Sequence, residues 1–227
     1  ARGLIDNEEM ARHLTAKYFA KVNLMDDALG QLLAEVRKLG LDDNTLIVFT
    51  ADHGNMLAER GRWFKSVMYE GSSRIPLIIK APTRSPHAAA FNRGRVVSEV
   101  VENIDIMPTL MEVIGLPIDQ QPGIQGRSLA NLAAGRDPNW KNVAYAELVG
   151  PQMVRTAGYK LIKNPPRRRT EAGDYELYDM VRDPKEDHNL AADPREAAIL
   201  AELKAKLEAW QQTTPPPPRI EQFTKAR

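Results

Sequence analysis

The sequence contains no cysteine among its 227 residues. This absence excludes disulfide bonds, thiolate metal ligands and a cysteine nucleophile within the chain, but it does not indicate a compartment. No apolar run approaches the roughly 18 residues that a membrane-spanning helix requires. No charged-then-apolar segment of the secretory kind opens the sequence. We therefore expect no membrane span, and we leave the localisation unassigned.

An excess of charge of either sign is also lacking. The chain has 31 basic and 30 acidic residues, which gives a formal net charge of +1. Without a strong positive field, we expect no general binding surface for nucleic acid or for anionic membranes. Hydrophobic residues make up 43% and charged residues 27%, as is ordinary for a globular protein. The length suits one large domain, or one domain with a small second one.

A short apolar run ends in polar side chains at residues 50–54. The run, Leu46 to Phe49, is rich in β-branched residues, which predicts a strand buried on both faces of a parallel sheet. Ligands bind just beyond the carboxyl ends of such strands, where Asp52 and His53 offer a carboxylate oxygen and an imidazole nitrogen to a divalent cation. We expect Gly54 to let the backbone turn there. From spacing alone, a functional site and a simple turn or helix cap are equally supported.

The segment before this strand has the periodicity of a long amphipathic helix. Asp6 or Asn7 can cap it, and Gly40 can end it. Its apolar residues recur at steps of three or four and predict one core-facing stripe, made of Met10, Leu14, Tyr18, Val22, Met25, Leu29, Leu32, Val36 and Leu39.

The pattern changes near Arg136 to short strands separated by turns. This spacing predicts a small antiparallel sheet, with strands at 143–149, 153–156, 159–163 and 175–178. Asp193 then opens a last helix that should cover one side of the sheet, and prolines from 215 onward start an extended tail. We therefore expect three parts: an α/β part at 1–135, an antiparallel sheet with one helix at 136–214, and a proline-rich tail at 215–227.

Motifs in one fixed order run along nearly the entire chain. They are Asp43 to Gly54, Trp63 to Lys65, Tyr69 and Glu70, Arg74 to Ile79, Asn103 to Asp105, Pro108 to Leu110, Gly126 to Leu129, Gly158 to Leu161, Glu176 to Asp179, Asp183 to Asp187, and Asn189 with Leu190. In these motifs the chain resembles the sulfatases of the alkaline-phosphatase-like superfamily, whose relatives hydrolyse phosphonate monoesters and phosphodiesters. The resemblance implies an α/β fold. The chain would form the C-terminal part of a mostly parallel sheet with flanking helices, followed by a small antiparallel-sheet subdomain with one C-terminal helix.

The resemblance also implies roles for individual residues. Asp52 and His53 match the second pair of ligands to a divalent cation, with calcium expected and manganese as the alternative. Lys65 matches the active-site lysine that contacts the nucleophile and a substrate oxyanion, although alone it would be interpreted as an exposed loop lysine. A cation and an ammonium stabilise the charge that develops on the ester oxygens. We therefore predict Lys65 and His53 as catalytic residues and Lys65 with Trp63 as substrate-binding residues, unless Trp63 only packs the loop.

Two parts of the family's site are not found in this sequence. The family's nucleophile is a formylglycine made from the first residue of Cys/Ser-x-Pro/Ala-x-Arg, and Ser128-Leu-Ala-Asn131, the nearest match, lacks the arginine. An Asp-Asp pair on an early strand is also absent, because Asp26-Asp27 lies in the predicted helix and Asp42-Asp43 in a turn. The chain begins without Met. We expect it to be the C-terminal half of a sulfatase-like protein.

Three functions remain open at this point. The first is metal-assisted hydrolysis of a small-molecule sulfate ester, with the nucleophile supplied by a missing N-terminal part, so that this chain alone would be inactive. The second is phosphonate monoester or phosphodiester hydrolysis at the same site. The third is a non-catalytic binding or assembly module. In each case the incomplete sheet would expose apolar faces, so we expect either the missing half or self-association to cover them. We also expect Glu70 and Arg74 to brace the loop after Lys65.

Overall fold

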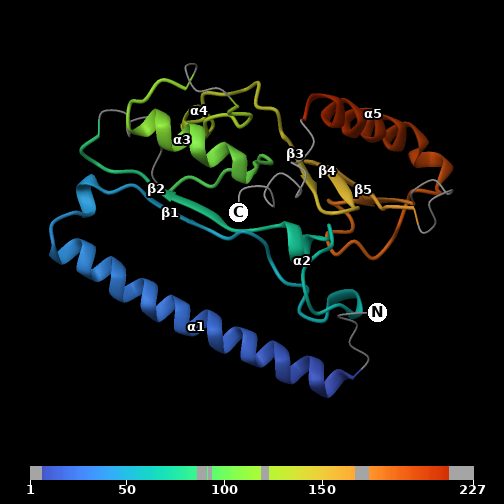
Figure 1. Cartoon of the computed structure of the whole chain (residues 1–227), viewed down its shortest axis with the longest axis horizontal. Coiled ribbons are helices and arrows are strands. Elements are labelled where there is room, and N and C mark those ends of the chain that lie inside the picture. Colours follow the sequence, from blue (N-terminus) through green and yellow to red (C-terminus); the bar gives the residue numbers. More distant parts are fainter. Residues whose placement is uncertain (1–6, 86–90, 92–93, 119–122, 167–173, 215–227) are drawn as a thin grey trace, which may run out of the picture.

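The computed structural model describes residues 7–85, 91, 94–118, 123–166 and 174–214 (Figure 1). The tail predicted at 215–227 lies outside these described residues. In chain order the elements are α1 (Glu8–Lys38), η1 (Asp42–Asn44), β1 (Ile47–Thr50), η2 (Glu59–Gly61), α2 (Glu70–Ser73), β2 (Leu77–Lys80), η4 (Asn103–Asp105), α3 (Ile106–Val113), α4 (Ala130–Ala133), β3 (Val143–Glu147), β4 (Gln152–Thr156), β5 (Tyr159–Lys163), β6 (Tyr175–Asp179), η5 (Pro194–Glu196) and α5 (Ala197–Thr213). In the described ranges, no helix is long and apolar enough to cross a membrane.

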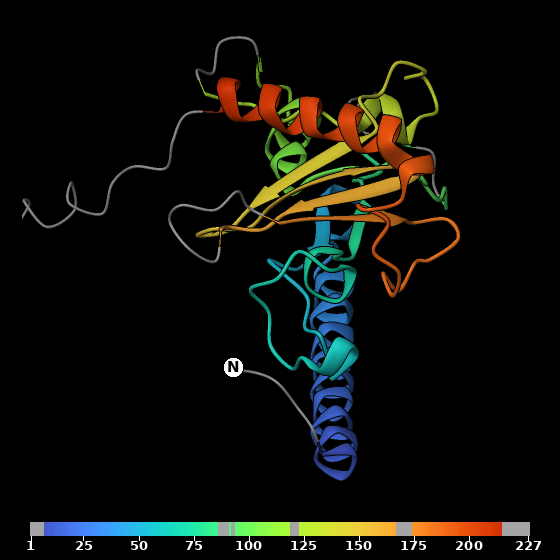
Figure 2. The same ribbon diagram turned by 90° about the vertical axis from the view of Figure 1, so that its right-hand side faces the viewer.

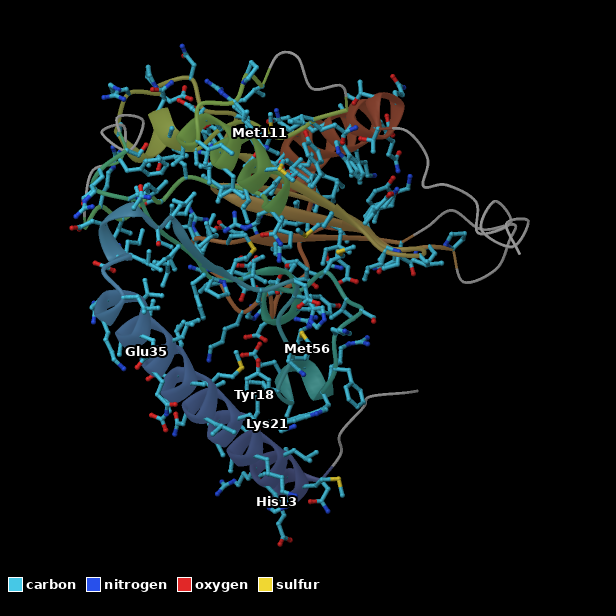
Figure 3. The ribbon with its side chains drawn as sticks, turned by 60° about the vertical axis from the view of Figure 1, so that its left-hand side comes forward. His13, Tyr18, Lys21, Glu35, Met56 and Met111 are labelled. Atoms are coloured by element: carbon cyan, nitrogen blue, oxygen red, sulfur yellow. The ribbon has the colours of Figure 1, made fainter. Side chains whose placement is uncertain are left out.

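The long N-terminal helix has the predicted bounds but lacks the predicted packing. The side chain of Asn7 accepts a hydrogen bond from the backbone N–H of Met10 at 3.0 Å, and Gly40 ends the helix region with a φ of 68°. No residue of α1 is buried, and the stripe residues Val22, Met25 and Leu32 are 44%, 64% and 60% exposed. The expectation of a core-facing stripe is therefore wrong for this chain by itself, because the described residues supply nothing that buries the stripe. In Figure 3, His13 lies near the far end of this helix, remote from Met111 on α3.

The first sheet is a pair of antiparallel strands. β1 pairs with β2 in the register Ile47 with Lys80 to Thr50 with Leu77. Leu77 and Ile79 pack towards the cluster of Leu129, Leu132 and Trp140 under α4, whereas Phe49 and Ile78 remain 36% and 62% exposed. The strand predicted to be buried on both faces of a parallel sheet is thus half-exposed and antiparallel to its neighbour. The reason is that a strand is buried on both faces only where other elements cover both, and one face of this pair is uncovered in the described part of the chain.

The second sheet confirms the predicted antiparallel subdomain. Its strands follow the order β3-β4-β5-β6, and each neighbouring pair is antiparallel. α5 lies across one face of it (Figure 2). There the sheet residues Val154, Leu161 and Leu177 form one buried cluster with Leu203 and Leu207 of the helix. The α/β class and the closing antiparallel sheet with its helix are therefore as predicted.

The opposite face of the same sheet holds the segment that follows β1. Met153, Ile162 and Tyr178 on the sheet pack against Met68 and against Met56 (labelled in Figure 3). Side chains alternate between the two faces along a strand, so this sheet is buried on both sides. The two parts expected at 1–135 and 136–214 consequently share one core, and the sheet is the platform on which the residues around position 60 are held.

The start of the last helix depends on the carboxylate of Asp193, which is half-buried. The side chain of Asp193 accepts a hydrogen bond from the backbone N–H of Arg195 at 2.9 Å, and its second oxygen lies 2.7 Å from the Arg195 guanidinium. These hydrogen bonds, first of all those from the Arg195 side chain, lower the pKa of Asp193 from 3.8 to about 2. A depressed pKa in the folded state means that the ionised carboxylate stabilises the fold above the unfolded pKa, and that this contribution is lost as the pH falls through the folded pKa.

We expect Asp193→Asn to be less stable than the native chain at neutral pH, with the difference closing between pH 4 and about pH 2, because only the charged form binds Arg195 strongly. The measurement is urea unfolding of both proteins across this pH range. The control is the same Asp193→Asn substitution made in an Arg195→Gln protein. There its effect on the free energy of unfolding should change little with pH. A stability difference between the two proteins that stays constant from pH 7 to pH 2 would contradict the lowered pKa of Asp193.

Candidate functional site

The candidate site begins where β1 ends. The side chain of Asn103 in η4 holds this strand end, since its amide nitrogen donates to the carbonyl oxygen of Ala51 at 3.2 Å and its amide oxygen accepts from the Thr50 hydroxyl at 3.5 Å. The sequence motif that contains Asn103 was recognised, but no role was predicted for this side chain. It fixes the direction in which the chain leaves the sheet.

Asp52 and His53 point their polar atoms towards the same place. The carboxylate oxygen Oδ2 of Asp52 lies 3.2 Å from Nε2 of His53, and Oδ1 accepts a hydrogen bond from the His53 backbone N–H at 2.9 Å. The Asp52 side chain is 85% exposed and that of His53 is 36% exposed. Both predicted metal ligands therefore reach the surface and have room for a ligand.

The tautomer of His53 follows from its second ring nitrogen. Nδ1 lies 2.9 Å from the carbonyl oxygen of Gly54. A carbonyl oxygen accepts only, so Nδ1 carries the proton whenever the ring is neutral, and Nε2 then presents a lone pair. This is the arrangement that a metal-binding imidazole needs, in which a backbone carbonyl fixes the tautomer and the ring orientation.

The ammonium of Lys65 completes the group. Its Nζ lies 2.5 Å from Nε2 of His53. The lone pair of Nε2 and the carboxylate of Asp52 are both electron-rich, so they repel each other at this separation unless a cation lies against them. Lys65 supplies a positive charge to that position. The predicted residues Asp52, His53 and Lys65 are thus brought together, although twelve positions separate His53 from Lys65.

Two donors make only part of a metal site. Asp52 and His53 offer one oxygen and one nitrogen, whereas hard divalent cations take about six ligands or more. Within the described residues, no group of three or more His, Cys, Asp or Glu side chains is placed to hold a metal ion. The carboxylates of Asp179 and Asp183 accept backbone N–H groups in the turn after β6. These contacts give both carboxylates a structural role.

The segment between His53 and Lys65 has an unusual backbone. Leu57, Ala58 and Arg60 have a positive φ, of 48°, 74° and 53°, and so does Ser66, directly after Lys65, at 76°. Such conformations are sparsely populated for residues other than glycine and persist where the surroundings determine them. Trp63 lies in this segment and is partly exposed, so its predicted contact with substrate is sterically open and remains a prediction.

The guanidinium of Arg60 fastens this segment to the second sheet. It lies 4.3 Å from the ring centroid of Tyr69 and 5.6 Å from that of Tyr178, and it donates to the backbone carbonyl oxygen of Glu186. Tyr69 and Tyr178 both donate their hydroxyls to the carboxylate of Glu176. Burial and this hydrogen bond to Glu176 raise the pKa of Tyr178, so the phenol stays protonated and remains a donor.

Gly54 is required by close packing rather than by a turn. Its φ is not positive, which corrects the expectation that it permits a sharp bend. Its backbone N–H donates to the carbonyl oxygen of Ser72 at 2.8 Å, and a Cβ built on Gly54 would lie 2.2 Å from the carbonyl oxygen of Gly71. α2 therefore rests directly on the backbone next to His53.

A buried lysine near the site was missed. Lys160 on β5 has no exposed surface and contacts Glu70 at the start of α2. The available signal was its position in a strand with apolar residues on both sides. A lysine in such a strand needs carboxylate partners if it is buried.

The chain matches a family model over residues 58–213, described as N-sulphoglucosamine sulphohydrolase, C-terminal. It is 32% identical over 206 residues to choline-sulfatase from Rhizobium meliloti, with 87% of this chain and 37% of that protein covered. It is also 32% identical over 206 residues to N-acetylglucosamine-6-O-sulfatase from Bacteroides thetaiotaomicron, with 86% of this chain and 35% of that protein covered.

Solved structures of similar enzymes also superpose on this chain. One, described as a complex with its substrate D-glucosamine-2-N,6-O-disulfate, superposes with a TM-score of 0.74 at 31% identity and covers 86% of this chain and 40% of its own. Phosphonate monoester hydrolase from Silicibacter pomeroyi superposes with a TM-score of 0.70 at 29% identity. The superposition covers 83% of this chain and 39% of that enzyme. The chain spans less than half the length of each of these relatives.

We expect Gly54→Ala to lower the free energy of unfolding by about 1–3 kcal/mol, because the new methyl group must displace α2 from the backbone beside His53. Chemical denaturation measures this loss. The matched control is Gly30→Ala in α1, where a Cβ meets nothing within 4 Å and alanine favours the helix, so this variant should be at least as stable as the native chain. A Gly54→Ala protein with native stability would contradict the close contact.

Proposed function

Because the chain belongs to the sulfatase family and corresponds to its C-terminal portion, we propose that it supplies one half of a metal-assisted site for hydrolysis of a sulfate ester. The observation that supports this most directly is the convergence of Asp52, His53 and Lys65 at the end of β1. A carboxylate, a neutral imidazole nitrogen and an ammonium at one place match the needs of a cation and of an anionic ester.

Asp52 Oδ2 and His53 Nε2 would hold the divalent cation, and their donor types fit one. We propose calcium, and the nitrogen donor is the reason to keep manganese as the alternative. A bound cation would act as a Lewis acid on an ester oxygen. Lys65 binds an oxyanion of the ester and favours the ionised form of a nearby nucleophile. Trp63, on the same segment, would line the substrate pocket.

The nucleophile and the remaining metal ligands come from outside this sequence in our proposal. The 227 residues contain no cysteine and no Ser-x-Pro/Ala-x-Arg motif. The relatives are more than twice as long as the part that this chain matches. We propose that the unmatched N-terminal portion contributes a formylglycine and the first pair of ligands, so that this chain alone hydrolyses no ester.

The substrate class is a small-molecule sulfate ester. The relatives named above are a choline-sulfatase and an N-acetylglucosamine-6-O-sulfatase, and one solved relative binds a disulfated glucosamine. The phosphonate monoester hydrolase among the structural relatives makes phosphonate or phosphodiester hydrolysis the second candidate. A purely non-catalytic module is the third, but such a module has no chemical need for the three converging groups.

Activity is tested in a chimera that places this chain behind the unmatched N-terminal portion of the Rhizobium meliloti choline-sulfatase. We expect the chimera to hydrolyse an aryl sulfate faster than a paired aryl phosphonate. Lys65→Ala should lower kcat/KM by about 10²-fold or more, as is typical when one donor to a developing oxyanion is removed. Lys206→Ala, exposed on α5, is the control and should leave kcat/KM unchanged.

Two results would contradict this proposal. One is full activity of the Lys65→Ala chimera. The other is turnover by the 227-residue chain alone that is abolished by Lys65→Ala, since that would mean the site is complete without a further portion.

We also propose that the N-terminal portion covers α1 and the open face of the β1–β2 pair. The residues that would be covered are apolar and exposed, and they include Phe19, Met25, Leu32, Phe49 and Ile78. Exposed apolar surface of this kind promotes association in water.

We therefore expect the purified chain to self-associate with rising concentration, as measured by light scattering. The variant Val22→Glu/Met25→Glu/Leu32→Glu should shift it to the monomer, because charges on the stripe oppose its burial. The control is Asn23→Glu/Gln31→Glu on the opposite face of the same helix, which should leave association unchanged. A native chain that stays monomeric at high concentration would contradict the prediction.

A further inference from the structure

An ionic cluster is buried between the second sheet and α2. Lys160 on β5 is 0% exposed, and its ammonium lies 2.6 Å from Oε1 of Glu70 and 2.7 Å from Oε1 of Glu186. Arg155 on β4 lies 3.6 Å from the same oxygen of Glu70. The cluster therefore contains two cations and two anions. Burial raises the pKa of Glu186 although the Lys160 ammonium opposes this, and burial lowers the pKa of Arg155.

The cluster holds α2 by its backbone as well as by its charges. Lys160 donates to the carbonyl oxygen of Met68 at 3.0 Å and to the hydroxyl of Ser73 at 3.3 Å. Oε2 of Glu186 accepts from the backbone N–H of Glu70 at 2.7 Å. Residues on both sides of the α2 N-terminus are thus tied to β5 and to the turn after β6. A turn of four residues has too little internal bonding to hold its own position.

From α2 a continuous set of hydrogen bonds leads to the site. The carbonyl oxygen of Ser72 accepts from the backbone N–H of Gly54 at 2.8 Å. The carbonyl oxygen of Gly54 accepts from Nδ1 of His53 at 2.9 Å. Nε2 of His53 then faces Lys65. Lys65 is itself only three residues before Met68, which Lys160 holds.

We propose that Lys160, together with Glu70 and Glu186, is a positioning cluster that fixes the tautomer and orientation of the His53 ring through α2 and Gly54. This inference rests on the proposed role of His53 at the site. It differs from the sequence prediction that Glu70 and Arg74 brace this loop. The ion pair between these two residues is long, at 3.9 Å, and Arg74 is 78% exposed, so it contributes little. The short contacts of Glu70 are with Lys160 instead.

Stability alone does not require such a cluster. A buried ion pair is often no more stable than apolar side chains of the same volume, because the charges lose their hydration. Two carboxylates within 3 Å of the same buried ammonium do, however, restrict the positions of the backbone atoms that these groups bind. The cluster is thus suited to fixing geometry.

The test reads the His53 ring directly in the full 227-residue chain. Histidine labelled with ¹⁵N is observed by NMR in a buffer alkaline enough to keep imidazoles neutral, and the His53 signals are assigned by their loss in His53→Asn. In the native chain we expect one tautomer with the proton on Nδ1. In Lys160→Met the two nitrogen signals should shift towards each other, because a ring released from the Gly54 carbonyl exchanges between tautomers.

Two further variants separate positioning from general stability. Leu207→Ala removes packing on the other face of the same sheet, so it should destabilise the chain and leave the His53 signals unchanged. Lys160→Met/Glu186→Gln leaves one cation, Arg155, and one anion, Glu70, in the cluster, so it should fold even if Lys160→Met does not. It should still shift the His53 signals. A folded protein with either Lys160 substitution and native His53 signals would overturn the proposal. Because the readout needs neither metal nor ester, its failure is distinct from failure of the proposed function.

Discussion

The constraint on which the rest of the structure depends is the burial of the Lys160 ammonium between two carboxylates. Removing one partner of such a group would leave an uncompensated buried charge, which costs about 3–5 kcal/mol in proteins. The partners of Lys160 come from segments about ninety residues before it and about twenty-five after it. Both segments must therefore reach their native positions together. The sheet that carries Lys160 thus determines where the residues around β1 lie.

The second sheet has two different faces because it serves two purposes. Towards α5 it is apolar, with Leu161 and Leu177 packed on Leu203 and Leu207. Towards the site it combines apolar residues with Lys160 and Tyr178, whose polar atoms bind the segment between His53 and α2. Apolar packing on the first face stabilises the fold but is not directional. The hydrogen bonds on the polar face are directional, so they select one backbone conformation. The positive φ values at Leu57, Ala58 and Arg60 occur in the segment that lies against this polar face, where contacts such as those of Arg60 with Tyr178 and Glu186 hold the backbone.

Local signals were sufficient for most of the elements and for part of the site. The Asn7 cap, the end of α1 at Gly40 and the four short strands follow from neighbouring residues, and the structure confirms them. Asp52, His53 and Lys65 were found by their motif. The partners of Lys160 could not be found this way, because nothing in the spacing of Glu70 or Glu186 indicates which lysine they meet. The antiparallel pairing of β1 with β2 was also not predictable, since an apolar run reports the burial that a strand needs and not which segment pairs with it. The exposed apolar face itself was expected of an incomplete sheet.

The half-site and the uncovered apolar surface have one physical explanation under the proposed function. Asp52 and His53 present two donors to a cation that takes about six or more, and Phe49 and Ile78 beside them present apolar side chains to water. Phe49 and Ile78 lie on the face of the β1–β2 pair opposite to Leu77 and Ile79, and Asp52 and His53 directly follow β1. A single further portion of protein that contacts both places would complete the coordination and bury the apolar face at once. Binding of the metal and closure of the core would then be thermodynamically linked, since a ligand that binds only the completed form stabilises that form.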